Sequence, residues 1–315
     1  MRAAQIDRFG GPEELHVVTD APTPTPGQGE VLVRVLAAGV NPLDYKIRDG
    51  SSGLAAKLTA DGFPLILGRE CCGVIEQVGP GVSDFAVGTR VFGMAPLSHR
   101  GECYAEFVAL PASALAPAPA SVDPQVLAGT ALVGLTAWVA VHDLARVTAD
   151  DTVLVHGGAG GVGQVVVQLC VAAGARVYAT ASTAKRSRIE EMGAIHVDYT
   201  QADFTQVTPR PDVIIDGVYF STYEPSMDHL AEGGRLVILP SLADLEPARA
   251  RGINVAVPTI SPDRERLAAL ATELEQGRLT IALDRVFPLT EAAAAHRLVE
   301  EGHTQGKVVL EVAND

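Results

Sequence analysis

The most constraining feature of the sequence is the glycine-rich stretch VLVHGGAGGVG at residues 153–163. Gly158, Gly160 and Gly163 match the G-x-G-x-x-G fingerprint of dinucleotide-binding turns. In that fingerprint the first glycine makes a tight turn, the second lets the backbone approach a pyrophosphate, and the third admits close helix–strand packing. We therefore expect nucleotide phosphates at the N-terminus of a helix that starts near Gly161, where unpaired N–H groups favour an anion.

The surroundings of the turn supply the strand–turn–helix–strand order that the fingerprint requires. An apolar run enters the turn, Gly174 follows the predicted helix, and a second apolar strand occupies 177–180. A glycine-rich loop with a purely structural purpose is the alternative. The residues that we expect to cradle the phosphates are Gly158, Ala159, Gly160, Gly161, Val162 and Gly163.

The residues after the second strand favour NADPH over NADH. Sites that prefer NAD usually place an acidic residue about 20 positions after the fingerprint, where it binds the ribose 2′-hydroxyl. Here Ala-Ser-Thr stands at 181–183, and Lys185, Arg186 and Arg188 follow. Hydroxyls and cations suit a 2′-phosphate, so we expect Ser182, Arg186 and Lys185 to contact it. The alternative is that these cations form the solvated face of the next helix, balanced by the acidic pair that follows them.

Length and composition favour a soluble enzyme of two domains. The 315 residues exceed what one hydrophobic core usually supports. Apolar residues make up 47% of the chain, yet no run approaches the roughly 18 apolar residues of a membrane span. The net charge of −14 disfavours nucleic acid as a partner. The N-terminal segment lacks the apolar core of a signal peptide, so we expect a cytoplasmic protein.

Hydrophobic periodicity divides the chain into two styles. Short β-rich runs between Pro/Gly turns fill the first 120 residues and predict a β barrel. From 121 to 277 strands alternate with helices, which predicts a doubly wound parallel sheet. The tail from 278 to 315 returns to β-like sequence and should rejoin the first domain. The predicted fold is therefore α/β, with one domain of residues 1–120 and 278–315 and a second of residues 121–277.

Further motifs stand in a characteristic order along the chain. They are AGVNPLD (38–44) with IRDG (47–50), VGPGV (78–82) with VGTRV (87–91), GLTA (134–137) and GKVVL (306–310). With the glycine turn, they resemble the zinc-independent medium-chain dehydrogenases/reductases, above all the zeta-crystallin-like NADPH:quinone oxidoreductases. The resemblance implies a GroES-like β-barrel domain, a Rossmann domain that binds NADPH, an active site in the cleft between them, and a homodimer.

Two positions argue against a catalytic metal. The zinc-bearing cousins of this family have a cysteine where Asn41 stands and a histidine where Arg69 stands. An amide cannot replace a thiolate ligand, and a guanidinium would repel the ion. Without a Lewis acid, alcohol oxidation is difficult because nothing stabilises the alkoxide. We therefore expect reduction, with hydride transfer from NADPH to a quinone or an α,β-unsaturated carbonyl compound.

The resemblance places the expected catalytic residues around the AGVNPLD motif. Asn41 is the main candidate to donate a hydrogen bond to the oxygen on which charge develops, although an asparagine before proline also suits a turn. Tyr45 or Lys46 would orient the substrate or return a proton. The active-site tyrosine of relatives falls near Lys46, so the proton donor stays open. Asp44 either acts in the site, holds the loop or pairs with Arg48.

The resemblance also adds cofactor contacts. Tyr199 matches a tyrosine that lies against the adenosine phosphate, and Gly217 and Val218 match the segment that passes beneath the cofactor. Thr136 either touches the nicotinamide region or bonds to its own backbone. Lys307 either reaches the cofactor cleft or is a solvent-facing strand lysine.

Three functions stay open at this stage. The first is an NADPH-dependent reductase of quinones or α,β-unsaturated carbonyl compounds. The second is an enoyl-thioester reductase of fatty-acid or polyketide metabolism, which uses the same hydride step on a carrier-bound substrate. The third is a non-catalytic NADPH-binding protein with a structural or sensing role, which would bind the cofactor and turn over no acceptor.

Overall fold

The computed structural model describes residues 1–58, 62–240 and 243–313. It divides into two compact units, one of residues 1–132 and 261–315, the other of residues 133–260. The first unit is thus larger than the β domain expected from the sequence, because it includes residues 121–132 and 261–277. Helix α9 (Arg264–Glu275) gives one physical reason. Its first residue donates hydrogen bonds to the backbone carbonyls of Ala112 and Leu115, which ties the helix to the first unit.

The first unit is built mainly of β structure. Its strands are β1 (Ala3–Ile6), β2 (His16–Val18), β3 (Glu30–Val40), β4 (Leu65–Ile66), β5 (Glu70–Val78), β6 (Arg90–Met94), β7 (Phe107–Pro111), β8 (Leu115–Pro117), β15 (Leu283–Pro288) and β16 (Lys307–Glu311). One sheet has the order β15-β16-β3-β5-β6-β8, with β7 also paired to β3, and a smaller sheet has the order β2-β1-β4. The predicted return of the C-terminal tail is confirmed, because β16 pairs with β3.

Strand β3 lies at the centre of this unit. Its sequence EVLVRVLAAGV is rich in Val and Leu, which suit a pleated strand, and it pairs antiparallel with β5, β7 and β16. Nearly all of its residues are buried, and its apolar side chains form the central part of the hydrophobic core. Two residues after the end of the strand, at Pro42, the chain has already turned into a helix.

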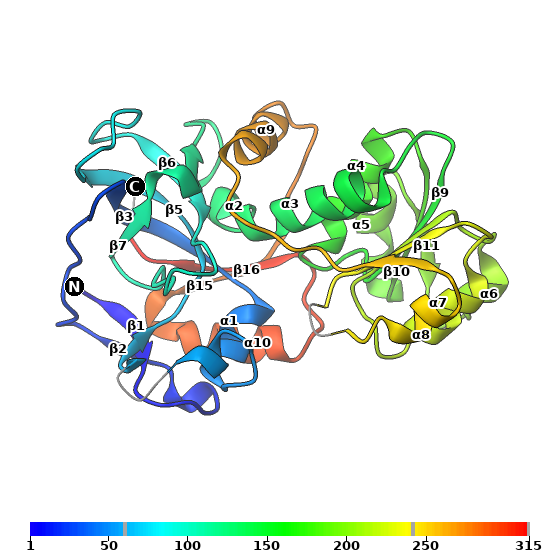
Figure 1. The fold of residues 1–315 in the computed structure, drawn as a ribbon, viewed down its shortest axis with the longest axis horizontal. Coiled ribbons are helices and arrows are strands. Elements are labelled where there is room, and N and C mark those ends of the chain that lie inside the picture. Colours follow the sequence, from blue (N-terminus) through cyan, green and yellow to red (C-terminus); the bar gives the residue numbers. More distant parts are fainter. Residues whose placement is uncertain (59–61, 241–242, 314–315) are drawn as a thin grey trace. The chain divides into compact units, whose positions relative to one another are not determined.

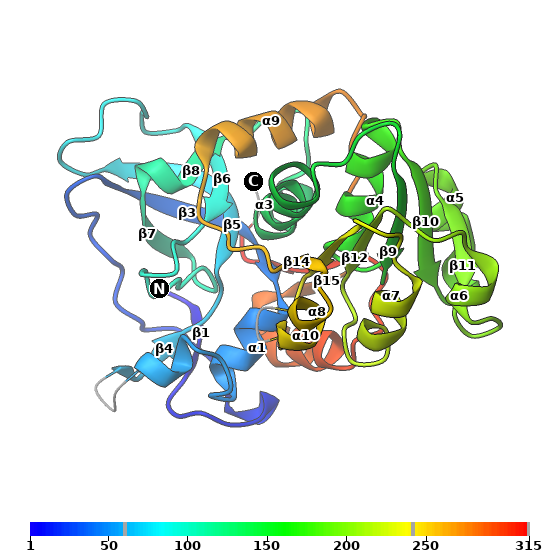
Figure 2. The same ribbon diagram turned by 45° about the vertical axis from the view of Figure 1, so that its right-hand side comes forward.

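The α-helices that accompany these strands are α1 (Pro42–Arg48), α2 (Pro124–Ala128), α9 and α10 (Ala292–Glu300). Helices α1 and α10 lie side by side (Figures 1 and 2). Helix α1 starts where it does because Pro42 fits the first helical turn, and because Asp44 Oδ2 accepts the backbone N–H of Asn41 at 2.8 Å. This local arrangement fixes Asn41 between the strand and the helix.

The second unit is a doubly wound α/β structure. Its strands are β9 (Thr152–His156), β10 (Arg176–Ala181), β11 (Ile195–Asp198), β12 (Val213–Asp216), β13 (Arg235–Ile238) and β14 (Asn254–Ala256). Its helices are α3 (Ala131–Trp138), which begins in the first unit, α4 (Gly163–Ala172), α5 (Arg186–Glu191), α6 (Phe204–Val207), α7 (Tyr223–His229) and α8 (Glu246–Ala250). Figure 2 shows α4 and α5 on one face of the sheet and α7 and α8 on the other.

The sheet of the second unit confirms the predicted Rossmann architecture. All its strands are parallel, in the order β11-β10-β9-β12-β13-β14. Numbered within this unit, that is the order 3-2-1-4-5-6, which reverses between β9 and β12. Ligands of such sheets bind outside the carboxyl ends of the strands at this reversal. No helix in the described parts of the chain is both long and apolar enough to cross a membrane.

Candidate active site

Three buried polar side chains meet where β3 ends and α1 begins, and we call them the Asn41 cluster: Asn41, Glu70 and Lys307. Each is at most 3% exposed. Glu70 is the first residue of β5 and Lys307 is the first residue of β16. Because both strands run antiparallel to β3, their first residues lie beside its last ones. The topology of the sheet therefore assembles the cluster.

Hydrogen bonds link all three members of the Asn41 cluster to one another. Lys307 Nζ donates to Asn41 Oδ1 at 2.6 Å, to Glu70 Oε1 at 2.9 Å and to the Val40 carbonyl at 3.1 Å. Asn41 Nδ2 donates to Glu70 Oε1 at 2.8 Å, and Glu70 Oε2 accepts the backbone N–H of Leu132 at 2.6 Å. The ammonium thus uses all three of its donors, as a buried charge must.

The sequence did not reveal this cluster in full. Of the two alternatives for Lys307, the solvent-facing one is wrong, because the side chain is 3% exposed and ion-paired. Glu70 was not predicted as a member of this site. The available signal was a carboxylate and an ammonium that each open an apolar strand, because such charges must find each other if the strands are buried.

A second polar network, built on Asp44, adjoins the cluster. Tyr104 Oη donates to Asp44 Oδ2 at 3.2 Å, His296 Nε2 lies 3.3 Å from Tyr104 Oη, and Arg48 Nη1 lies 3.2 Å from His296 Nδ1. A guanidinium can only donate, so His296 Nδ1 accepts and its Nε2 carries the hydrogen. All these hydrogen bonds therefore point from Arg48 toward the Asp44 carboxyl group.

The Asp44 network fixes the protonation state of His296 and the ion-pair partner of Arg48. Burial, together with the smaller effect of the Arg48 guanidinium, lowers the pKa of His296 to about 3, so the imidazole is neutral. Arg48 pairs with Glu300 at 2.5 Å, so the expected alternative of an Asp44–Arg48 pair is not formed. Asp44 instead holds the loop through the backbone N–H of Asn41.

The environment of Asp44 alters its acidity. Burial raises the pKa of Asp44 to about 7, and nearby Glu70 raises it too, while the Asn41 N–H and Lys307 act in the opposite direction. Asp44 Oδ1 is buried without a hydrogen-bond partner among the described residues. The raised pKa means that this carboxyl group changes protonation near neutral pH, and the unpartnered Oδ1 leaves an oxygen free to carry the proton.

Tyr45 and Lys46, the two candidates for proton transfer, are half-buried on α1. Burial raises the pKa of Tyr45 above its ordinary value, at which a phenol already carries its proton at neutral pH. Within the described residues neither side chain hydrogen-bonds to the Asn41 cluster.

Arg69, which stands where the zinc-bearing cousins have a histidine, is held by hydrogen bonds to the backbone. The guanidinium of Arg69 donates to the backbone carbonyls of Ala95, Pro96 and His99. Within residues 1–58, 62–240 and 243–313, no three His, Cys, Asp or Glu side chains are grouped as a metal site. At the two positions that distinguish the zinc-bearing cousins, the side chains are thus occupied with protein hydrogen bonds.

The glycine turn of the second unit follows β9 and leads into α4. Its left-handed residue is Gly157, with a φ of +73°, which directly precedes the first glycine of the fingerprint. A Cβ on Gly163 would lie 2.1 Å from the Gly157 carbonyl oxygen, and one on Gly158 would lie 2.7 Å from the Cβ of Ala179. A Cβ on Gly160 would meet only the Gly157 oxygen, at 3.3 Å. The open backbone at Gly160 before the ten-residue helix α4 suits a pyrophosphate.

Buried side chains support this turn from below. Thr180 Oγ1 accepts the backbone N–H of Gly157 at 3.2 Å, and His156 lies between Thr180 Oγ1 at 3.3 Å and Ser226 Oγ at 3.2 Å. Burial lowers the pKa of His156 to about 4, so it is neutral. His156 is the last residue of the buried strand β9.

The residues expected at the 2′-phosphate lie after β10. Ser182 and Lys185 are half-buried, whereas Arg186 is exposed and its Nε pairs with Glu190 at 3.0 Å. The alternative interpretation, a solvated face balanced by acidic residues, therefore describes the arrangement of Arg186. The sequence analysis did not place Asp198 in this region, where its carboxylate accepts a hydrogen bond from the Thr183 hydroxyl at 2.5 Å. This carboxylate comes from the neighbouring strand β11, so its position in the sequence did not indicate it.

The other expected cofactor contacts also belong to the second unit. Gly217 and Val218 follow β12 and are exposed, and a Cβ on Gly157 would lie 3.5 Å from a methyl group of Val218. The turns after β9 and β12 are therefore in contact. Tyr199 follows β11 and is 59% exposed, and Thr136 is half-buried on α3.

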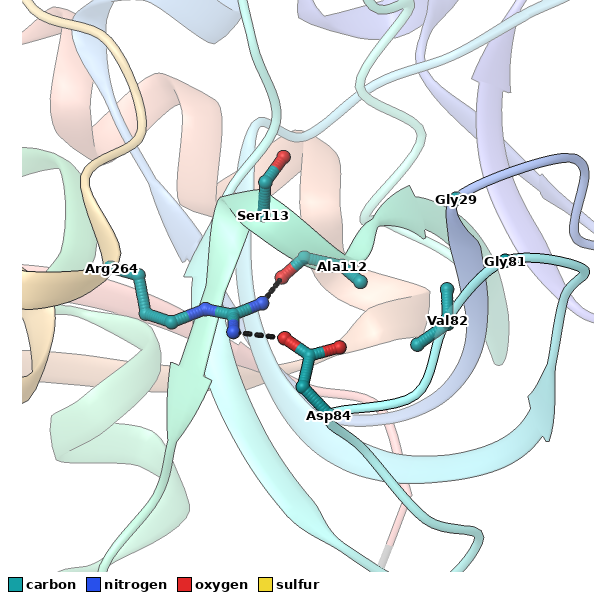
Figure 3. A pocket seen from close by; sticks show the side chains of 7 residues that line it. All are labelled: Gly29, Gly81, Val82, Asp84, Ala112, Ser113 and Arg264. Atoms are coloured by element: carbon teal, nitrogen blue, oxygen red, sulfur yellow. Dashed lines mark hydrogen bonds and ion pairs between the residues drawn. The ribbon is translucent and has the colours of Figure 1, made fainter.

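A cavity of about 340 Å³ in the first unit lies away from the Asn41 cluster. It is lined by Gly29, Gly81, Val82, Asp84, Ala112, Ser113 and Arg264 (Figure 3). Arg264 already binds Asp84 and two backbone carbonyls, so the cavity offers a ligand few free donors. It adjoins the first residue of β3, roughly 35 Å from Asn41 along the strand.

Comparisons with known proteins agree with this architecture. Residues 27–120 match the family model described as "Alcohol dehydrogenase GroES-like domain", and residues 192–310 match the one described as "Zinc-binding dehydrogenase". A quinone oxidoreductase of Coxiella burnetii superposes with a TM-score of 0.95, at 33% identity over 99% of both chains. The Escherichia coli quinone oxidoreductase complexed with NADPH superposes with a TM-score of 0.87, at 25% identity over 99% of this chain and 100% of that one.

Two curated relatives extend the comparison. A 2-haloacrylate reductase of Burkholderia is 31% identical over 98% of both chains. A mycocerosic acid synthase-like polyketide synthase of Mycobacterium tuberculosis is 32% identical over 91% of this chain, which spans only 14% of that much longer protein. The chain belongs to the zinc-independent medium-chain dehydrogenase/reductase family, with the quinone oxidoreductases. It is an oxidoreductase, as its sequence motifs indicated.

Proposed function

We propose that the chain is an NADPH-dependent reductase that delivers hydride to a quinone or to the β-carbon of an α,β-unsaturated carbonyl compound. The quinone oxidoreductases and the 2-haloacrylate reductase support this acceptor class, and the Escherichia coli complex supports NADPH. The observation that carries the proposal is the Asn41 amide. One Nδ2 hydrogen binds Glu70, and the second has no partner within the described residues.

The Asn41 amide would stabilise the charge that develops during reduction. When bound, NADPH supplies a hydride, and negative charge then develops on the carbonyl oxygen of the acceptor. A donor that is already fixed in place stabilises this oxyanion without reorganising during the reaction. We assign that role to the second Nδ2 hydrogen of Asn41. Tyr45, whose phenol carries its proton at neutral pH, is the proposed proton source, and Lys46 and Asp44 are the proposed accessory residues.

The second unit would hold the cofactor. The backbone from Gly158 to Gly163 would bind the pyrophosphate at the start of α4. Ser182, Lys185 and Arg186 would bind the 2′-phosphate, which requires Arg186 to leave its pair with Glu190. The remaining proposed contacts are Thr136, Tyr199, Gly217 and Val218. For the quaternary state and location we propose a homodimer in the cytoplasm.

A specific match favours a second candidate function. The similarity to a polyketide synthase extends over 91% of this chain. An enoyl-thioester reductase uses the same hydride transfer and the same oxyanion stabilisation, with the acceptor held on a carrier or on coenzyme A. The residues proposed above would have the same roles in both reactions, so only the acceptor distinguishes the two.

Oxidation of NADPH and NADH at 340 nm tests these proposals. The acceptors are a benzoquinone, a naphthoquinone, an alkyl enone and crotonyl-coenzyme A. We expect turnover with NADPH on the quinones or the enone, at least tenfold above that with NADH. Turnover on crotonyl-coenzyme A alone would favour the thioester reductase. Tight NADPH binding without turnover of any acceptor would contradict both and favour a non-catalytic role.

A further inference from the structure

We propose that Lys307 and Glu70 are positioning residues that set the orientation and the donor strength of the Asn41 amide. The proposal deepens the role given to Asn41 above and rests on it. It also gives Lys307 a role different from the cofactor contact that the family resemblance implies. The argument starts from the geometry of the Asn41 cluster.

The two charged partners permit only one orientation of the Asn41 amide. An ammonium can only donate hydrogen bonds, and an ionised carboxylate can only accept them. Lys307 Nζ lies 2.6 Å from Oδ1, and Glu70 Oε1 lies 2.8 Å from Nδ2. A flipped amide would place its NH2 group against the ammonium and its oxygen against the carboxylate. The pair therefore specifies which end of Asn41 can donate.

The same contacts increase the donor strength of the amide. A cation on the carbonyl oxygen withdraws electron density from the amide nitrogen and makes its N–H groups better donors, and such polarisation is strong in a buried site. The carboxylate takes one hydrogen and leaves the other available. Because Lys307 and Glu70 carry opposite charges, the arrangement polarises Asn41 without adding net charge to the core.

The surrounding backbone keeps Glu70 in place. A Cβ on Gly39 would lie 2.1 Å from Glu70 Oε1 and 2.6 Å from the Ala128 carbonyl oxygen, so only glycine leaves room for the carboxylate. The second oxygen, Oε2, accepts the N–H of Leu132, which lies in the first turn of α3. Both carboxylate oxygens are thus committed, and the position of Asn41 follows from them.

Stability alone does not account for a charged cluster at this place. A buried ion pair loses its hydration, and well-packed apolar residues of similar volume often give equal or greater stability. The strands that carry Glu70 and Lys307 are otherwise apolar at their buried positions. An ionic cluster that encloses one amide is therefore best explained by what it does to that amide.

Two linked experiments test the proposal. In the first, the protein carries ¹⁵N only in its asparagine side chains, and the Asn41 NH2 signals are identified by their absence from Asn41→Ala. Lys307→Met should move both signals upfield, whereas Lys57→Met, at an exposed lysine, should leave them unchanged. Asn41 signals in Lys307→Met that coincide with those of the wild type would overturn the proposal.

The second experiment is a double-mutant cycle on hydride transfer. With NADPH and the best acceptor, Lys307→Met should lower the single-turnover rate at least tenfold and change the NADPH dissociation constant less than twofold. In an Asn41→Ala background the same change should lower the rate less than twofold. An equal loss in both backgrounds would contradict the proposal, and so would a loss that lies in NADPH binding.

Two further arms keep these outcomes interpretable. If Lys307→Met does not fold, Lys307→Met combined with Glu70→Gln removes both charges together and takes its place. If the wild type turns over no acceptor while the NMR shifts follow Lys307, the proposed function fails and the positioning of Asn41 stands. If the wild type turns over an acceptor and Lys307→Met causes equal losses in both backgrounds, the positioning of Asn41 fails and the proposed function stands.

Discussion

The Asn41 cluster and the glycine turn differ in how the sequence specifies them: strand pairing assembles the cluster, whereas the turn is one contiguous stretch. The cluster joins residues 29, 237 and 266 positions apart, and it exists only because three strands bring their ends together. The turn is contiguous, and its requirements are a left-handed backbone at Gly157 and the absence of a Cβ at Gly158 and Gly163. Long-range ion pairs therefore depend on the whole first unit, whereas the turn depends mainly on its own sequence.

The largest expected effect concerns the ion pair of the cluster. Glu70→Ala leaves the Lys307 ammonium buried without a carboxylate, which should lower the free energy of unfolding by about 3–5 kcal/mol. Urea denaturation measures it. The control is Glu76→Ala on the same strand, because the exposed Arg34–Glu76 pair at 2.9 Å should contribute less than about 1 kcal/mol. Equal losses in the two variants would mean that burial does not distinguish these pairs.

The next effect tests the local character of the turn. Gly163→Ala forces a Cβ against backbone, so it should weaken NADPH binding more than a hundredfold and lower the melting temperature. Gly160→Ala brings its methyl group near one backbone oxygen only, at 3.3 Å, so it should lower the melting temperature less than Gly163→Ala and still weaken NADPH binding, because the methyl group covers the open backbone. Fluorescence titration and thermal unfolding measure the two quantities. Tight NADPH binding by both variants would exclude the turn as the phosphate site.

A pH series separates the Asp44 network from the rest of the fold. The pKa of Asp44 is raised from 3.8 to about 7, so between these values the native state holds a proton that the unfolded chain has released. Its stabilising contribution is complete below pH 4 and is lost as the pH rises toward 7. Relative to Asp44→Asn, the wild type should lose on the order of 2 kcal/mol between pH 5 and pH 7.

The variant is needed as the reference because two histidines act in the opposite direction. The lowered pKa values of His156 and His296 make the fold more stable as the pH rises through the same range. Both histidines are present in both proteins, so their effect cancels in the difference. Parallel pH profiles for the wild type and Asp44→Asn would show that Asp44 keeps an ordinary pKa.

The smallest expected effect concerns the choice of cofactor. Arg186→Glu should weaken NADPH binding about tenfold and leave NADH binding nearly unchanged, because only NADPH carries the 2′-phosphate. Stability should change by less than about 0.5 kcal/mol, since Arg186 is exposed. Isothermal titration with both nucleotides measures the difference. Equal weakening for both would remove Arg186 from the 2′-phosphate site and direct attention to Lys185 and Ser182.

How far the sequence could predict the structure depended on distance along the chain. The apolar strand that enters the glycine turn, the strand at 177–180 and the return of the tail were predicted because their signals lie within short windows. The partner of Asp44 was not, because Arg48 is near in sequence but pairs with Glu300 on α10 instead. The position of Asp198 was not predicted either, because the pairing of neighbouring strands, rather than nearness in sequence, brings it beside Thr183.

The sequence by itself determined the Rossmann unit, the glycine turn and the family, because periodicity, missing side chains and motif order are local properties of the chain. Only the tertiary structure decided that Lys307 is buried, that Glu70 binds it, and that both hold the amide of Asn41. The physical reason is that a buried charge needs a partner, and the partner is chosen by how strands pair rather than by their distance in sequence.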